Sequence, residues 1–203
     1  MTAVAHSNLV RFRDCTPQPW ANGNGVTREL AAGQDHDRDS GFAWRLSVAD
    51  VQSGPFSALP GVDRVFTLAA GPTITLAIDG NEVTADPFRP VRFPGESRVE
   101  CTTPEPTRAV NVMARRGRFS ADVSVRIGTG QVAAPLERVT YLVALAGTAT
   151  IRPARGSTET LDLFDAVRLR NTVEVSTSSG GRVAVVRLTP TYRSALGADS
   201  GSR

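Results

Sequence analysis

Lysine is absent from this chain, and all 23 of its basic residues are arginine. The formal net charge of +3 is therefore carried by side chains that present a planar fork of donors to carboxylates. Most of these arginines are spread singly, and the one cluster is Arg115, Arg116 and Arg118 around Gly117. No aromatic platform or recognition motif accompanies that cluster, so we expect no nucleic-acid partner.

Histidine and cysteine are also scarce, with two residues of each type. His6 lies near the N-terminus and His36 in a charged segment, and neither has a neighbour at metal-ligand spacing. Cys15 and Cys101 lack a CxxC spacing, so neither a disulfide framework nor a zinc site is indicated. We expect no metal and no cofactor, and we expect both cysteines to pack as small hydrophobic residues.

Long apolar runs are missing as well. No segment approaches the roughly 18 consecutive apolar residues of a membrane span. The N-terminus lacks the charged, apolar and small-residue regions of a signal peptide. The hydrophobic content of 40% is ordinary for a globular protein in solution. The sequence therefore predicts a cytoplasmic protein without a membrane partner.

What the chain does contain is a series of short runs rich in β-formers, separated by Gly, Pro and Asp. No segment has a helical period longer than two turns, and residues 42–49 alternate between an apolar and a polar face. Strands are expected near residues 8–13, 42–49, 65–69, 73–78, 82–85, 91–93, 98–102 and 109–114. This spacing is typical of an antiparallel sandwich or barrel.

The second half of the chain repeats the first at a shift of 76 residues without a gap. The shift pairs Gly71 with Gly147, Gly80 with Gly156, Phe88 with Phe164, Val91 with Val167, Phe93 with Leu169, Val99 with Val175, Val110 with Val186 and Val112 with Leu188. We therefore expect an all-β fold built from two copies of one β-barrel unit. The copies should pack together, because one unit alone buries too little surface.

The two copies differ in the residues that carry chemistry. Under the same shift Arg64 becomes Thr140, Asn111 becomes Arg187 and Met113 becomes Thr189. Only the first copy is preceded by the glycine-rich residues 20–30 and by the strand around Trp44. We expect an N-terminal barrel with the ligand site at 1–118, a C-terminal barrel at 119–190, and a disordered tail at 191–203.

Residues 20–30 contain two glycines, two asparagines and an Arg-Glu pair between a tryptophan and the next leucine. The glycines permit a positive φ or a close approach of another group, and asparagine tolerates the same backbone region. A tight turn is one interpretation, and a binding segment is the other. If residues 26–30 are extended, alternation places Thr27 and Glu29 on one face and Arg28 on the other. Which face lines a cavity stays open.

Six motifs follow one another along the chain. They are Trp20-x-Asn22-Gly23-x-Gly25-x-Thr27-Arg28-Glu29, Trp44-Arg45-Leu46-Ser47, Gly54-Pro55-Phe56-Ser57, Pro60-Gly61-Val62-Asp63-Arg64, Phe93-Pro94-Gly95-Glu96 and Asn111-Val112-Met113. In order and spacing they resemble the HutD/Ves family over nearly the whole chain, with a departure at Asn24, where the family often has a third glycine. The resemblance implies a bicupin fold, two packed RmlC-like barrels or jelly rolls. It also implies a governor of histidine utilisation that binds an acidic intermediate such as formylglutamate or urocanate, in a family without a well-established enzymatic activity.

The partner that this implies is a small acidic metabolite, held in the first barrel. Arg45 and Arg64 are the candidate carboxylate clamps. The remaining candidates are Asn22, Thr27, Ser47 and Asn111 as neutral donors and acceptors, Trp20, Phe93 and Met113 as walls, and Arg28 and Glu29 beside them. Arg45 lies opposite the Trp44 face of its strand, so one of the two points into the cavity.

Two other functions stay open. The alternative is a metal-free cupin enzyme, an isomerase or hydrolase for a polar small molecule. In it Glu29 would be the general base, and Arg28 or Arg64 would stabilise an oxyanion. A third hypothesis is a protein-binding regulator. A monomer and a homodimer are both compatible with the sequence.

Overall fold

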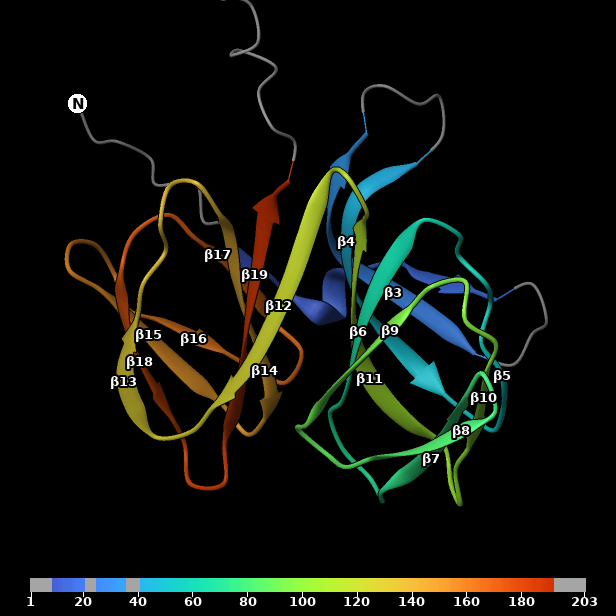
Figure 1. Cartoon of the computed structure of the whole chain (residues 1–203). Coiled ribbons are helices and arrows are strands. Elements are labelled where there is room, and N and C mark those ends of the chain that lie inside the picture. Colours follow the sequence, from blue (N-terminus) through green and yellow to red (C-terminus); the bar gives the residue numbers. More distant parts are fainter. Residues whose placement is uncertain (1–8, 21–24, 36–40, 192–203) are drawn as a thin grey trace, which may run out of the picture.

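The computed structural model describes residues 9–20, 25–35 and 41–191. Apart from one short 3-10 helix, η1 (Phe12–Asp14), the regular elements in these ranges are β-strands. The strands form two barrels that stand side by side (Figure 1). The all-β expectation is confirmed. No helix in the described part of the chain is long and apolar enough to span a bilayer.

The first barrel consists of a six-stranded and a four-stranded antiparallel sheet. In order, the larger sheet contains β2 (Pro17–Pro19), β3 (Val26–Gln34), β4 (Phe42–Val51), β11 (Thr107–Arg115), β6 (Val62–Leu68) and β9 (Pro90–Pro94). The smaller contains β5 (Gly54–Pro55), β10 (Val99–Thr102), β7 (Ile74–Ile78) and β8 (Asn81–Ala85). The concave face of the larger sheet therefore looks toward the smaller sheet.

The second barrel is built in the same way. Its larger sheet contains β1 (Leu9–Val10), β17 (Ala166–Leu169), β14 (Val139–Ala146), β19 (Arg182–Pro190) and β12 (Phe119–Arg126). Its smaller sheet contains β13 (Thr129–Val132), β18 (Val173–Thr177), β15 (Ala149–Pro153) and β16 (Glu159–Leu161). β1 thus belongs to the sheet of the second repeat, which a division after residue 118 did not anticipate.

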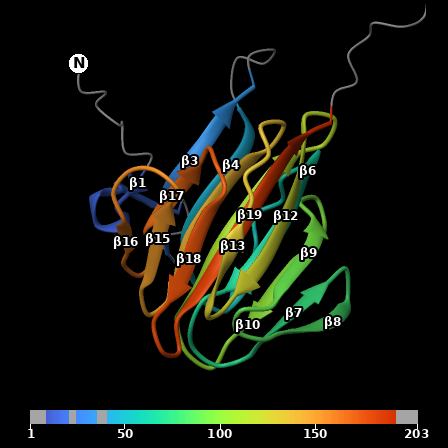
Figure 2. The same cartoon turned by 90° about the vertical axis from the view of Figure 1, so that its left-hand side faces the viewer.

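Three apolar cores hold the molecule together. One fills each barrel, and the third lies between the two larger sheets, which pack face to face. Figure 2 looks onto the second barrel with β3, β4, β6 and β9 of the first behind it. In the shared core the rings of Trp44 and Tyr141 lie 5.8 Å apart. Burial of this shared face explains why the two units are packed together.

Alternation along β4 determines which side chains reach the interior of the first barrel. Trp44, Leu46 and Val48 belong to the core between the barrels. The intervening residues Arg45 and Ser47 therefore face the interior of the first barrel. The choice that the sequence left open for this strand is decided by the packing of the second barrel against the Trp44 face.

The repeat is visible in the backbone geometry. Phe88 and Phe164 are 76 residues apart, and both have φ 65°, a region that bulky residues rarely adopt. Their N–H groups donate to the carbonyls of Leu68 and Ala144, in both cases at 2.8 Å. The same uncommon turn has been kept at equivalent places in both units, so the second half repeats the first in structure as well as in sequence.

Two details of the sequence comparison were wrong. β12 pairs with β19 as β4 pairs with β11, so the strand around Trp44 does have a counterpart in the second unit. The pairing of the last strand, β19, is also shifted by two residues. Arg64 pairs with Met113 in the first barrel, but its equivalent Thr140 pairs with Arg187 rather than with Thr189. A β-bulge between Ala144 and Ala146 contributes to this shift. An ungapped comparison of sequences cannot detect a change of register.

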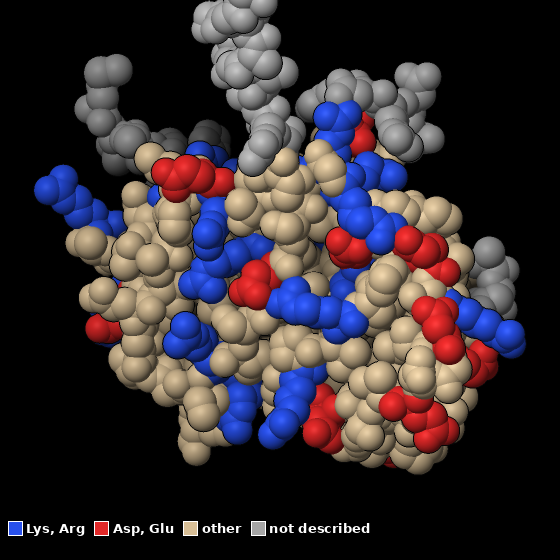
Figure 3. Space-filling view, in the orientation of Figure 1, with Lys and Arg blue, Asp and Glu red and all other residues tan. Residues whose placement is uncertain are grey.

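Charges of both signs are interspersed over the face of the molecule shown in Figure 3. Ion pairs at the protein surface include Arg92 with Asp122 at 2.7 Å and Arg152 with Glu174 at 2.7 Å. Exposed pairs of this kind contribute little to stability. The arginines on this face are therefore mixed with acids rather than joined into one basic stripe.

Candidate ligand-binding site

A cavity of about 430 Å³ lies inside the first barrel, on the concave face of its larger sheet. Its walls come from β2, β3, β4, β6 and β11 and from the segment at β5. The lining residues are Gln18, Pro19, Trp20, Thr27, Arg45, Ser47, Ala49, Asp50, Val51, Pro55, Phe56, Ser57, Leu59, Arg64, Phe66, Asn111 and Met113. The volume is that of a site for a small ligand.

Two arginines and a methionine form one row across this wall. Met113 on β11 pairs with Arg45 on β4 and with Arg64 on β6. Cross-strand partners point to the same side of a sheet, so all three side chains enter the cavity. With adjacent strands roughly 5 Å apart, the Cα atoms of the two arginines lie about 10 Å apart.

Arg64 is buried, with 7% of its surface exposed. Its Nη2 donates to Asn111 Oδ1 at 3.2 Å, and its Nη1 reaches the Ser57 carbonyl at 3.5 Å, while Nε has no partner. The guanidinium lies 5.2 Å from the ring centres of Phe56 and Phe93. Burial, and secondly the charge of Arg45, lower the pKa of Arg64 to about 10. It is therefore a cation at neutral pH that lacks an ionic partner.

Arg45 is the second cation of the row. Its Nη2 lies 3.2 Å from the Met113 sulfur, and its guanidinium lies 4.8 Å from the centre of the Phe42 ring. Its Nε has no hydrogen-bond partner. Burial lowers the pKa of Arg45, and the charge of Glu29 partly opposes that shift. Within the described residues no carboxylate lies in ion-pair range of Arg45 or Arg64.

The next row of the sheet supplies neutral polar groups. Asn111 on β11 pairs with Ser47 on β4, and both are buried. Asn111 orients Arg64 through the hydrogen bond described above. The Ser47 hydroxyl is buried without a partner, which is costly unless water or a ligand satisfies it. This row can therefore accept from and donate to a polar ligand.

Trp20 closes one side of the cavity at the end of the β2–β3 hairpin. Its Nε1 donates to Thr27 Oγ1 at 2.8 Å, and its backbone N–H donates to the Gly25 carbonyl at 2.9 Å. A Cβ added at Gly25 would lie 3.0 Å from the indole ring. Gly25 thus permits the close approach that the glycine-rich motif predicted, and the indole becomes a wall of the cavity.

Of the ten predicted site residues that the structure describes, three are not on the cavity wall. Arg28 faces away, with its guanidinium 5.1 Å from the centre of the Phe12 ring, and Glu29 is exposed on the cavity side of β3 but does not line the cavity. Phe93 lies behind Arg64 and packs into the barrel core. Asn22 lies outside the described residues. The other seven predicted residues are brought together.

The sequence interpretation missed the apolar half of the cavity. Phe56, Ser57 and Leu59 come from the Pro/Gly-rich segment after β4, and Phe66 from β6. The motif Gly54-Pro55-Phe56-Ser57 is one of the six family motifs, but no site residue was predicted in it. Its presence among those motifs was the available signal. Pro55 and Gly54 pair with β10 and hold the segment across the barrel end.

The cavity suits an organic anion. It combines two cations, neutral hydrogen-bonding groups and aromatic or aliphatic walls. Asp50 borders it, but its carboxylate accepts a hydrogen bond from Arg108 Nε at 3.1 Å. Among the described residues no group of three or more His, Cys, Asp or Glu side chains could hold a metal ion. Glu29, the candidate general base of the alternative enzyme, is exposed and is not among the residues that line the cavity.

Comparison with known protein sequences supports the family that the motifs resemble. The HutD family profile matches residues 13–186. An uncharacterised 21.2 kDa protein from the 3′ region of hutC in Pseudomonas putida is 31% identical over 175 residues, which cover 85% of this chain and 91% of that protein. Protein Ves of Citrobacter koseri is 38% identical over 110 residues, or 52% of this chain and 56% of Ves.

Solved structures give the same result. HutD from Pseudomonas fluorescens SBW25 matches with a TM-score of 0.77 and 26% identity, covering 90% of this chain and 97% of that one. A cupin 2 conserved barrel domain protein from Leptotrichia buccalis matches with a TM-score of 0.55 and 9% identity, covering 89% and 95%. The second likeness concerns the fold alone, which is that of two packed cupin barrels. With the profile matched over most of its length, this chain belongs to the HutD family.

Proposed function

We propose that this chain is a metabolite-binding protein that serves histidine utilisation as a regulator, and that its ligand is a small carboxylic acid held in the first barrel. The observation that carries the proposal is the pair Arg45 and Arg64, two guanidinium groups that enter one cavity without a carboxylate partner. Unpaired buried charge is unfavourable, so such a pair is expected where a ligand supplies the opposite charge.

Binding of a carboxylate in this cavity would be favoured by two interactions. It would accept charge-assisted hydrogen bonds from guanidinium donors, and it would relieve the repulsion that contributes to the lowered pKa of Arg64. Asn111, Ser47 and Thr27 are placed to bind its polar groups, and Phe56 and Phe66 to contact its carbon skeleton. The walls thus favour a small acid with an organic body over an inorganic anion.

The biological setting comes from the relatives. The Pseudomonas putida relative is named for its place beside hutC, and the matched structure carries the name HutD. This supports a part in histidine utilisation, with formylglutamate or urocanate as the leading candidate ligands. A regulatory role fits a cavity that has no positioned general base among its described residues.

The test is isothermal titration of metal-stripped protein with formylglutamate, urocanate, glutamate and histidine, followed by chromatography of the recovered ligand. We expect saturable binding of one of the acids, recovered unchanged, and no detectable binding of its neutral amide. Equal binding of acid and amide would contradict the role of the two arginines. Recovery of a converted compound would show an enzyme and would make the Glu29→Gln variant the next experiment.

A further inference from the structure

The N-terminal strap, residues 9–20, connects the second barrel to the ligand cavity of the first. Its beginning, β1, pairs with β17 in the second barrel, Leu9 with Val167 and Val10 with Ala166. Its end, β2, pairs with β3 in the first barrel and contributes Gln18, Pro19 and Trp20 to the cavity wall. One short segment therefore spans from a sheet of one barrel to the binding site of the other.

Asp165 of the second barrel anchors the middle of the strap. Its side chain is 4% exposed. Oδ2 accepts from Arg11 Nη1 at 2.6 Å, and Oδ1 accepts from the backbone N–H of Phe12 at 2.9 Å. Oδ2 also accepts from the N–H of Asp162 at 3.0 Å. A buried carboxylate with several charge-assisted or backbone donors is a strong point of attachment.

Aromatic packing reinforces this anchor. The Phe12 ring lies 5.1 Å from the ring of Phe164, the neighbour of Asp165. The guanidinium of Arg28 on β3 lies 5.1 Å from the Phe12 centroid, and that of Arg108 on β11 lies 5.8 Å away. Phe12 is thus held by both barrels at once, six residues before Gln18 reaches the cavity.

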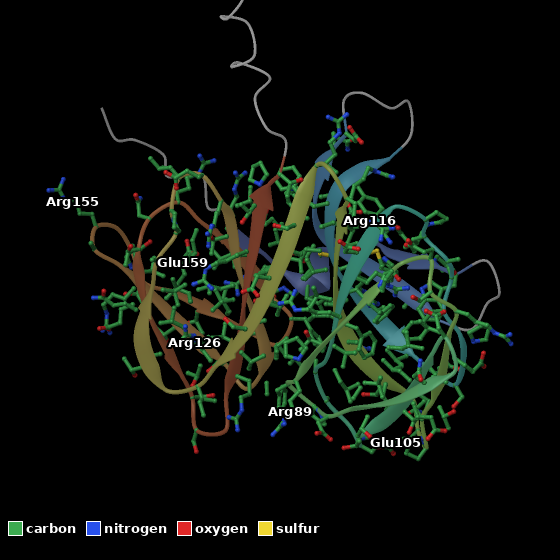
Figure 4. All side chains as sticks on the ribbon, in the orientation of Figure 1. Arg89, Glu105, Arg116, Arg126, Arg155 and Glu159 are labelled. Carbon is green, nitrogen blue, oxygen red and sulfur yellow. The ribbon has the colours of Figure 1, made fainter. Side chains whose placement is uncertain are left out.

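The first repeat shows that Asp165 is not needed to build its own turn. The equivalent turn has Phe88 at the same φ of 65°, and Arg89 N–H donates to the Asp86 carbonyl as Asp165 N–H donates to the Asp162 carbonyl. At the position of Asp165 the first repeat has Arg89, whose side chain is 82% exposed and lies near the junction of the barrels in Figure 4. The turn forms with either residue, so the carboxylate has a separate purpose.

That purpose is found at the other end of the strap. Trp20 is held to β3 by its bonds to Thr27 and Gly25, and β2 holds Gln18 opposite Thr27. β2 is a three-residue edge strand that includes two prolines, which lack N–H donors. Such a strand has few ladder hydrogen bonds of its own, so its position depends on the anchor that precedes it.

We propose that Asp165 is a positioning residue for the ligand site: by binding Arg11 and the Phe12 N–H it fixes the strap, and through β2 it holds the Trp20 wall against the cavity. The effect on ligand binding rests on the proposed function. The effect on Trp20 does not, because it concerns the protein without ligand. The second barrel, which lacks the arginine pair, thereby contributes to binding in the first.

The experiment compares Asp165→Asn and Arg11→Ala with the wild type in two measurements at 25 °C. The first is acrylamide quenching of tryptophan fluorescence, which reports on Trp20 because Trp44 is buried between the barrels. We expect the quenching constant to rise about twofold in both variants, because the strap opens locally. The second is titration with formylglutamate and urocanate, in which we expect about a tenfold loss of affinity, because the wall is misplaced.

Arg89→Asn is the matched control, because it changes the equivalent residue of the first repeat. We expect it to leave both measurements unchanged. The double variant Asp165→Asn/Trp20→Phe separates positioning from general loss of stability. If Asp165 acts through the Trp20 wall, the affinity loss of the double variant is smaller than the product of the two single losses. Arg11→Ala removes a partner whose side chain is 31% exposed, against 4% for Asp165, so it tests the anchor even if the Asp165 variant folds poorly.

Unchanged Trp20 quenching in both variants would overturn the proposal, whatever happens to affinity. A rise in quenching with unchanged affinity for an acid that the wild type binds would also overturn it. If the wild type binds none of the acids, the proposed function fails, but increased Trp20 quenching would still support the anchoring of the wall by Asp165. Failure of one proposal is thus distinguishable from failure of the other.

Discussion

The two barrels have the same arrangement of strands but differ in the side chains that face their interiors. Across the larger sheet of the first barrel, the row that contains Phe93, Arg64, Met113 and Arg45 faces the interior, and its last three residues line the cavity. The corresponding row of the second barrel reads Leu169, Thr140, Arg187 and Asp122. Its Asp122 is exposed and its Arg187 half-buried. The second barrel thus has a buried Thr140 where the first has the buried cation Arg64, while Arg187 is half-buried like Arg45.

The next row shows the same contrast. Asn111 and Ser47 in the first barrel correspond to Val185 and Ser124 in the second, judged by their pairing with Phe66 and Leu142. The interior of the second barrel is filled by aliphatic side chains from every strand of its larger sheet except β12. In these two rows the second barrel buries only the hydroxyls of Thr140 and Ser124, so this fold closes without a buried guanidinium or amide there. The buried Arg64 and Asn111 of the first barrel therefore reflect a requirement other than folding.

The largest effect is expected from Arg64→Met, which keeps an unbranched side chain and removes the charge. Affinity for the acidic ligand should fall on the order of 100-fold, because a buried guanidinium–carboxylate contact is lost. The Tm of the free protein should rise by about 2–4 °C, because an unpaired buried charge is removed. Calorimetric titration and thermal unfolding measure the two changes. An affinity within twofold of the wild type would show that Arg64 does not bind the acid.

The matched change in the second barrel is Thr140→Val. Thr140 is fully buried and its hydroxyl has no partner, so an isosteric apolar residue should also stabilise the protein, by about 1 kcal/mol. Ligand affinity should not change. A loss of affinity in this variant would contradict the assignment of binding to the first barrel alone.

A second prediction concerns pH. The pKa of Arg64 is lowered to about 10, so affinity should be constant from pH 7 to 9 and should fall above pH 10, by roughly tenfold per pH unit. A base with a lowered folded-state pKa binds more protons when unfolded between about pH 10 and 12.5, so this group makes stability rise with pH across that window. Loss of binding would therefore not arise from unfolding caused by Arg64.

Titrations at pH 8, 9, 10 and 11 check this, with near-UV circular dichroism to confirm that the protein stays folded. In Arg64→Met the residual binding should lose this dependence. Affinity that is flat to pH 11 in the wild type would show that the charge of Arg64 is not used, or that the bound acid is held elsewhere.

The smallest effect is expected from removing one hydroxyl. Ser47→Ala should reduce affinity about fivefold, because one hydrogen bond to the ligand is lost. Ser124→Ala removes the equivalent buried, unpartnered hydroxyl of the second barrel and should leave affinity unchanged. Competition titration against the wild-type ligand resolves a difference of this size. If Ser47→Ala and Ser124→Ala reduced ligand affinity equally, the Ser47 hydroxyl would have no special part in binding.

Some of the site could be predicted because its signals are local. Gly25 beside Trp20 indicated a close approach, and alternation placed Arg45 and Ser47 on one face of their strand. The place of Phe56 on the cavity wall could not be predicted, because the segment around β5 has no periodicity and its position depends on pairing with β10. Glu29 shares the face of Thr27, but its position along the strand leaves it exposed outside the cavity lining.

The sequence by itself determined the all-β class, the repeat and the two arginines, since alternation and a constant 76-residue shift are properties of the order of residues. It did not determine every strand, because the strand expected at 8–13 ends at Val10 and is followed by the 3-10 helix Phe12–Asp14. Only the tertiary structure decided which face of β4 is interior, that Arg187 rather than Thr189 stands beside Thr140, and that residues 9–20 reach from Asp165 to the cavity. The physical reason is that period two defines two faces without saying which is buried. That choice, the register and the strap all depend on burial of the two larger sheets against each other, a contact between residues far apart in the chain.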